Sequence, residues 1–66
     1  MNELETKVLM AAQEPDGAWY AFTTPSFKTA TELLGRGLLK RLPRSVSPFH
    51  DGFKITRAGK QSLLRG

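Results

Sequence analysis

The chain has 66 residues, no cysteine, one histidine and a formal net charge of +4. This length suits one domain over residues 1–66, and the lack of cysteine excludes disulfides and cysteine-ligated zinc sites. No apolar run approaches the roughly 20 residues of a membrane span. The acidic first residues lack the basic start of a signal peptide, so we expect a cytoplasmic protein without membrane contact.

Charge is unevenly distributed along the chain. Residues 1–16 hold one basic and four acidic side chains, whereas residues 17–66 hold nine basic and two acidic ones. Such asymmetry is typical of a protein with one surface facing a polyanion. A general excess of charge that keeps a small protein soluble would give the same balance.

A helix and a turn open the chain. Asn2 and Glu5 have the spacing of a capping box, and apolar residues recur from Leu4 onward at the period of one helix face. Proline, aspartate and glycine at 15–17 have the chemistry of a turn. The pattern predicts a helix over residues 3–13.

The aromatic run at residues 18–22 predicts a short strand. Trp19 and Ala21 share one side of this strand, and Tyr20 and Phe22 share the other. These rings could stack on nucleic acid. We expect instead that Trp19 and at least one other ring belong to the core.

A second helix then leads into a hairpin and a last helix. Thr24 and Pro25 are typical of a helix start, and Thr56 is typical of another. The hairpin is expected to turn Leu38 and Leu42 inward. The predicted helix, two strands and last helix cover residues 25–36, 38–42, 53–55 and 57–64. The sequence therefore predicts an α+β fold of order α-β-α-β-β-α with a small antiparallel sheet.

Two segments resemble winged helix-turn-helix regulators. Residues 29–41 are similar to the recognition helix of that family and the turn after it, and residues 53–64 are similar to the end of its wing. The resemblance implies a winged-helix protein of the small phage or prophage type. In DNA-binding members, the second helix of the helix-turn-helix lies in the major groove and the wing contacts the neighbouring backbone. The helix that braces the recognition helix is reduced or missing here, because only a turn and a strand fit before residue 25.

The favoured function is binding of duplex DNA, as a transcriptional regulator or an architectural factor. Polar and basic residues on the second helix suit base edges and phosphates, and the hairpin adds basic residues. The predicted contact residues are Ser26, Lys28, Thr29, Arg36, Lys40, Arg41, Arg44 and Lys54. A solvated helix face, which also contains Glu32, would explain the same residues on the helix.

The alternative function is a protein-interaction module. A phage-type inhibitor that docks on a host protein complex, as some anti-CRISPR proteins do, would fit the reduced bracing helix and the acidic first helix. Phe49 and His50, in a long loop over residues 43–52, are the candidate contacts. A phenylalanine folded back onto the domain and a solvated histidine would explain the same loop.

A homodimer is a third hypothesis, because a second copy would add buried area to a small core. We expect no enzyme: the sequence has no Ser–His–Asp spacing, no metal-ligand motif and no glycine-rich phosphate loop. No metal and no cofactor are therefore expected.

Overall fold

Three helices and three strands make up the part of the chain that the structure describes. The computed structural model describes residues 2–43 and 48–65. The elements are α1 (Glu3–Ala11), β1 (Ala18–Ala21), α2 (Pro25–Gly35), β2 (Leu39–Arg41), β3 (His50–Ile55) and α3 (Arg57–Arg65). The predicted α+β class and element order are confirmed. The largest error in a boundary is at β3, which begins three residues earlier than predicted and takes His50 out of the loop.

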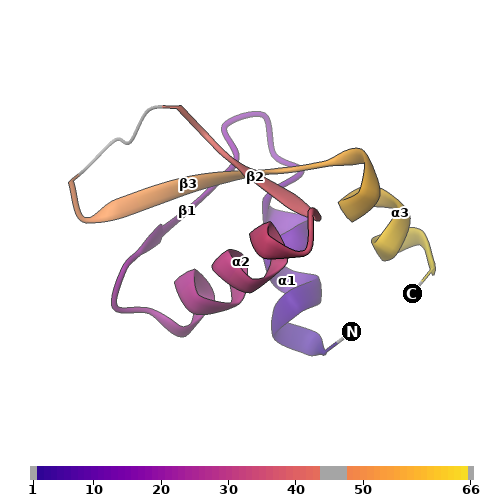
Figure 1. Ribbon diagram of the computed structural model, residues 1–66, viewed down its shortest axis with the longest axis horizontal. Helices are drawn as coiled ribbons and strands as arrows, with labels where there is room; N and C mark the ends of the chain where they lie inside the picture. Colours follow the sequence, from indigo (N-terminus) through magenta and orange to yellow (C-terminus); the bar gives the residue numbers. More distant parts are fainter. Residues whose placement is uncertain (1, 44–47, 66) are drawn as a thin grey trace.

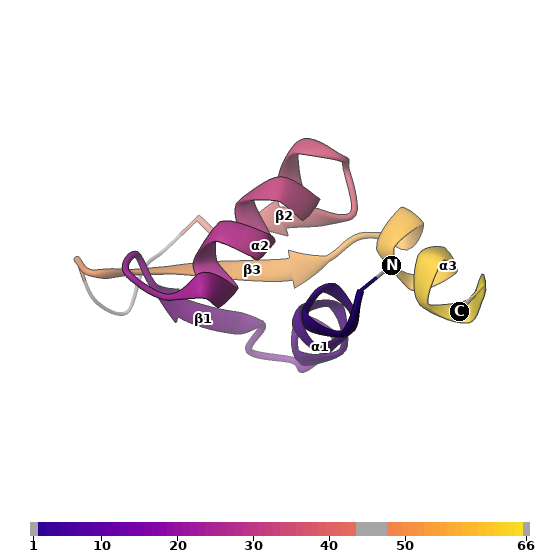
Figure 2. The ribbon, with the colours of Figure 1, turned by 90° about the horizontal axis from the view of Figure 1, so that it is seen from below.

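The sheet is antiparallel throughout, with β3 between β1 and β2. Ala18 pairs with Phe53 on one side of β3, and Leu39 pairs with Ile55 on the other. Figures 1 and 2 show α2 lying across one face of the sheet and α3 beyond the end of β3. We call the face that carries Phe53 and Leu39 the helix side, and the opposite face the outer face.

The hydrophobic core lies between the helices and the helix side of the sheet. Every large apolar side chain that is fully buried contributes about 1.5–3 kcal/mol relative to an exposed one. The fully buried large side chains come from α1, α2, β2 and β3, so each of these elements contributes to the same core. The buried hydrophobic residues are Val8, Leu9, Ala12, Ala18, Ala30, Leu33, Leu38, Leu39, Phe53 and Ile55.

The prediction that β2 turns Leu38 and Leu42 inward is wrong in part. Leu38 is buried, but it lies in the turn before the strand, and Leu42 is only half-buried. The inward residue of the strand is Leu39, which is 2% exposed. Gly37 reverses the chain with a φ of 80°, so the alternation starts one residue later than expected. A shift of one residue exchanges the two faces of a strand.

Trp19 lies on the outer face, and its predicted place in the core is wrong. Its ring covers Gly52 so closely that a Cβ at that glycine would clash with it. The indole Nε1 donates a hydrogen bond of 2.7 Å to the carbonyl of Asp16. Tyr20 packs against the core instead, with its ring centroid 6.4 Å from that of Phe53.

The start of α3 is fixed against the turn between α2 and β2. Gly59 approaches the carbonyl of Leu38 so closely that any side chain there would clash. Thr56 Oγ1 donates to the carbonyl of Gly37 at 2.7 Å and accepts from the Gly59 amide at 3.1 Å. We call this junction of Gly37, Leu38, Thr56 and Gly59 the closed end of the sheet.

Candidate nucleic-acid interface

The exposed face of α2 carries Lys28. The helix begins at Thr24, whose Oγ1 accepts a hydrogen bond of 3.2 Å from the amide of Phe27. Its buried face is set by Ala30 and Leu33, so Lys28 on the other side reaches solvent. Glu32, one turn further along, is exposed as well, and the two charges cancel formally.

Two other predicted contacts on α2, Ser26 and Thr29, are only half exposed. Ser26 lies one turn before Ala30 on the buried face of the helix, and Thr29 lies beside that face. A side chain in this position offers less surface to a groove than a residue on the opposite side of the helix. Of the three predicted contacts in the first turns of α2, Lys28 is therefore the most accessible.

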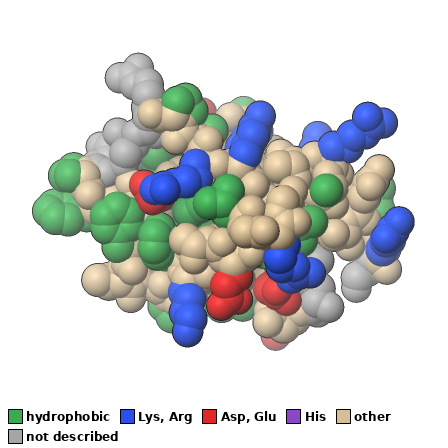
Figure 3. Space-filling model, viewed as in Figure 1, with side chains coloured by type: hydrophobic (Ala, Val, Ile, Leu, Met, Phe, Trp, Pro, Cys, Tyr) green, Lys and Arg blue, Asp and Glu red, His purple; other side chains and the backbone are tan. Residues whose placement is uncertain are grey.

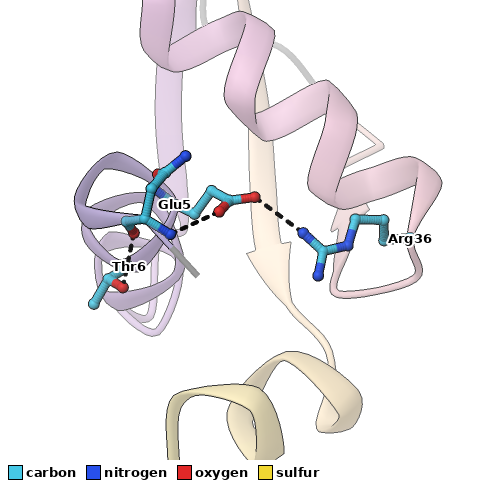
Figure 4. A network of polar contacts seen from close by, with 4 residues as sticks. Glu5, Thr6 and Arg36 are labelled. Atoms are coloured by element: carbon cyan, nitrogen blue, oxygen red, sulfur yellow. Dashed lines mark hydrogen bonds and ion pairs between the residues drawn. The ribbon is translucent and has the colours of Figure 1, made fainter. Parts of the chain in front are cut away.

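Arg36 points toward α1. Its Nη1 lies 2.9 Å from Oε2 of Glu5, and Figure 4 shows this pair bridging the two helices. The other oxygen of Glu5 accepts a hydrogen bond of 2.9 Å from the amide of Asn2. Eight residues separate Lys28 from Arg36, which is roughly 12 Å along a helix. Arg36 and Lys28 are therefore not neighbours.

The two basic residues of β2 lie on opposite faces of the sheet. Lys40 is on the outer face, directly across from Lys54, and it is exposed. Arg41 is on the helix side, where it forms an ion pair with Asp51 of β3. Successive residues of a strand alternate between faces, so no single surface of the ribbon presents both cations.

Lys54 is bound to the backbone of the turn after α1. Its Nζ donates hydrogen bonds to the carbonyl oxygens of Glu14 and Pro15, at 2.5 and 3.1 Å. The side chain is half-buried. Lys54, one of the predicted DNA contacts, therefore ties this turn to the sheet. Arg44, the last of the predicted contacts, lies outside the described residues.

The predicted contact residues thus do not form one cluster. Figure 3 shows the Lys and Arg side chains of one face lying mostly apart from one another, with other side chains between them. Of the predicted cations that the structure describes, Lys28 and Lys40 are the two whose side chains make no ion pair or hydrogen bond with another described residue.

Sequence reasoning missed the cations of α3. Arg57, Lys60 and Arg65 are all exposed, and the helix contains no acidic residue. Positions four residues apart share a helix face, so Arg57 and Arg65, eight apart, lie on one stripe. The signal was present in the sequence as a cationic run without a carboxylate. Lys60 also lines a shallow hollow of about 370 Å³, together with Gln13, Leu63 and Leu64.

Aromatic rings reach solvent at the other end of the sheet. Phe49 is 70% exposed and Phe22 is 47% exposed. The amide of Phe22 donates a hydrogen bond of 3.1 Å to the carbonyl of Phe49, and its ring centroid lies 5.1 Å from that of Phe27 in α2. We call Phe22, Phe27 and Phe49 the aromatic end.

The aromatic end is continuous with the core. The rings of Phe27 and Phe53 are 6.1 Å apart between centroids, and those of Tyr20 and Phe53 are 6.4 Å apart. Burial raises the pKa of the Tyr20 phenol above its ordinary value of 10.0. Exposure therefore increases stepwise from the buried Phe53, through the half-buried Tyr20 and Phe27, to Phe22 and Phe49.

Comparisons with known proteins add no family or fold relationship. The chain matches no protein-family model, and no curated protein or solved structure shows significant similarity to it. None of the helices in the described part of the chain has the length and apolar character needed to cross a bilayer.

Proposed function

We propose that the protein binds duplex DNA through α2 and the neighbouring ribbon of β2 and β3. The observation that carries the proposal is the excess of exposed cations on these elements. In the described residues, α2, its C-cap and β2 expose Lys28, Arg36, Lys40 and Arg41 against one exposed acid, Glu32. α3, which lies outside the proposed interface, adds Arg57, Lys60 and Arg65 without an acid. Such an imbalance favours a polyanion.

The connection between helix and ribbon supports the same proposal. α2 ends at Gly35, and Gly37 then takes a left-handed conformation that leads the chain into β2. A winged helix with a reduced bracing helix would have this order of elements. Residues 12–24 contain one regular element, β1, and α1 packs directly on α2. In this account, α1 takes over the bracing of α2.

Arg36 and Arg41 remain available to phosphates despite their ion pairs. Both arginine side chains are more than half exposed, at 55% and 59%. Their carboxylate partners, Glu5 and Asp51, are 14% and 17% exposed. A guanidinium has five N–H donors, so a phosphate can bind those that the carboxylate does not use. Lys28 is the primary contact of α2. Lys40 lies on the outer face of β2, the edge strand of the sheet, so it reaches a phosphate around that edge.

The test is a salt series with a fluorescent duplex, followed by anisotropy. Each phosphate contact lowers the slope of log affinity against log salt by about 0.9. Lys28→Ala and Lys40→Ala should each weaken binding and reduce the magnitude of that slope by about one contact. Lys7→Ala is the matched control. It removes the same charge, but Lys7 lies on α1, where it pairs with Glu3.

Three outcomes of this series would contradict the proposal. The first is no binding of any duplex at low salt. The second is a loss of affinity in Lys7→Ala as large as that in Lys28→Ala. Binding would then depend on the total charge of the protein and not on the position of the lysine. The third is a loss confined to Arg57→Ala and Lys60→Ala, which would move the interface to α3.

A further inference from the structure

The aromatic end offers a hydrophobic surface beside cations. Figure 3 shows hydrophobic side chains gathered toward the end of the molecule where α2 and β3 begin. Phe22 and Phe49 are cross-strand neighbours, because Ala21 pairs with His50 and the hydrogen bond between the two phenylalanines continues that register. The two residues therefore occupy paired positions at the same end of the sheet.

Two cations on the helix side are next to rings connected to the aromatic end, one in sequence and one in strand register. Lys28 follows Phe27 in the first turns of α2 and is exposed. The ring of Phe27 packs on Phe53, whose partner in β2 is Arg41. Asp51, which pairs with Arg41, is 17% exposed as a side chain, whereas Arg41 is 59% exposed. Arg41 is therefore more exposed than its acidic partner, and Lys28 makes no ion pair with a described residue.

The size of the surface decides which partner it fits. A phenylalanine can bury roughly 200 Å², so rings that are 70% and 47% exposed offer roughly 230 Å² together. A stable protein interface buries about 800 Å² on each partner, several times more than these rings supply. One or two stacked nucleobases match the smaller area, and aromatic stacking accepts any base.

We propose that the aromatic end stacks on an unpaired base of DNA, so that the protein prefers duplex with a bulged or unpaired nucleotide over fully paired duplex. This inference rests on the proposed DNA binding and adds a substrate class to it. Phe49 supplies the stacking ring, Phe22 supports it from the neighbouring strand, and Lys28 and Arg41 hold the flanking phosphates.

The test compares two short duplexes of equal length, one fully paired and one with a single unpaired adenine. The native protein should bind the second roughly tenfold more tightly, the factor expected for one stacked base. Phe49→Ala should abolish this preference and change affinity for the paired duplex by less than about twofold, since paired DNA is held by phosphate contacts. Phe49→Tyr should retain it, because the ring remains.

Two exposed side chains elsewhere provide matched controls. Met10 is 58% exposed and Leu64 is 87% exposed, so Met10→Ala and Leu64→Ala remove apolar surface without touching the aromatic end. Both should keep the preference for the unpaired base. Phe49→Leu, which keeps apolar surface but loses the ring, should lose it.

Each remaining outcome has one meaning. Equal affinity of the native protein for the two duplexes overturns this inference and leaves the proposed function intact. Failure to bind either duplex at low salt overturns both. Self-association that rises with protein concentration and disappears in Phe49→Ala would assign the aromatic end to a second copy of the chain and would overturn the inference.

Discussion

The two ends of the sheet are built in opposite ways. At the closed end, Thr56 satisfies two backbone groups, and Gly59 lets α3 meet the backbone of Leu38 directly. At the aromatic end, Phe22 and Phe49 keep about half or more of their surface in water. The closed end is therefore held together by direct backbone contacts. Surface that contributes little to folding is left where a ligand can reach it.

The largest contrast is expected when the same truncation is made at a ring of the core and at a ring of the aromatic end. Phe53→Ala should lower the free energy of unfolding by about 3–5 kcal/mol, because Phe53 is completely buried. Phe49→Ala should change it by less than about 0.5 kcal/mol. Urea unfolding followed by the fluorescence of Trp19 measures both. Similar losses at the two positions would show that the aromatic end is also part of the core.

If Phe53→Ala fails to fold, Phe53→Leu gives a graded version of the test. Exchange of one large apolar side chain for another usually costs less than about 1.5 kcal/mol. The expected order of stability is native, Phe53→Leu, Phe53→Ala. A Phe53→Leu protein as stable as the native protein would contradict this order.

A glycine pair tests the closed end. Gly59→Ala should cost about 1–3 kcal/mol, since the new Cβ would clash with the carbonyl of Leu38 and with the Ile55 side chain. Gly35→Ala is the control, because nothing lies within 4 Å of a Cβ there and alanine favours a helix by up to about 1 kcal/mol. Thermal unfolding should show opposite shifts. A melting temperature unchanged by Gly59→Ala would contradict the close contact.

The ion pair next to the closed end should matter less. Glu5→Gln removes the attraction to Arg36 and retains an oxygen that can accept the hydrogen bond from the Asn2 amide. The expected loss is about 0.5 kcal/mol at low salt, and it should shrink as salt screens the native pair. Urea unfolding at two salt concentrations gives both values. A loss that stays the same at high salt would show that packing, rather than charge, is affected.

Tyr20 lies between the two ends, and its burial should make the stability of the fold depend on pH in the alkaline range. Burial raises the pKa of its phenol in the folded protein, so the folded state resists ionisation that the unfolded chain permits. The free energy of unfolding should therefore decrease as the pH rises through and above about 10, the unfolded value. Tyr20→Phe should flatten this decrease. An identical alkaline profile in both proteins would assign the loss to other groups.

Local signals in the sequence predicted the elements well. The capping box at Asn2, the start of α2 at Thr24 and the cap at Thr56 all form as predicted. These features depend on residues a few positions apart. The alternation of rings in β1 is also confirmed, since Tyr20 and Phe22 contact the aromatic cluster on the helix side.

Long-range features were not predictable in the same way. Nothing near Arg36 in the sequence indicates that Glu5, 31 residues earlier, would accept its guanidinium. Lys54 is likewise held by carbonyls about 40 residues away. The outward placement of Trp19 depends on Gly52, its partner in the sheet. Each of these outcomes needs the strand register, which a hydrophobic pattern alone does not fix for such short strands.

The most direct measurement of the central claim is a nuclear magnetic resonance titration of the isotope-labelled protein with duplex DNA. Binding through α2 and the ribbon predicts that backbone amides around Lys28 and Lys40 shift most. The amides of residues 3–7 in α1 should stay in place. An absence of shifts at low salt, or shifts confined to α1 or to α3, would contradict the account.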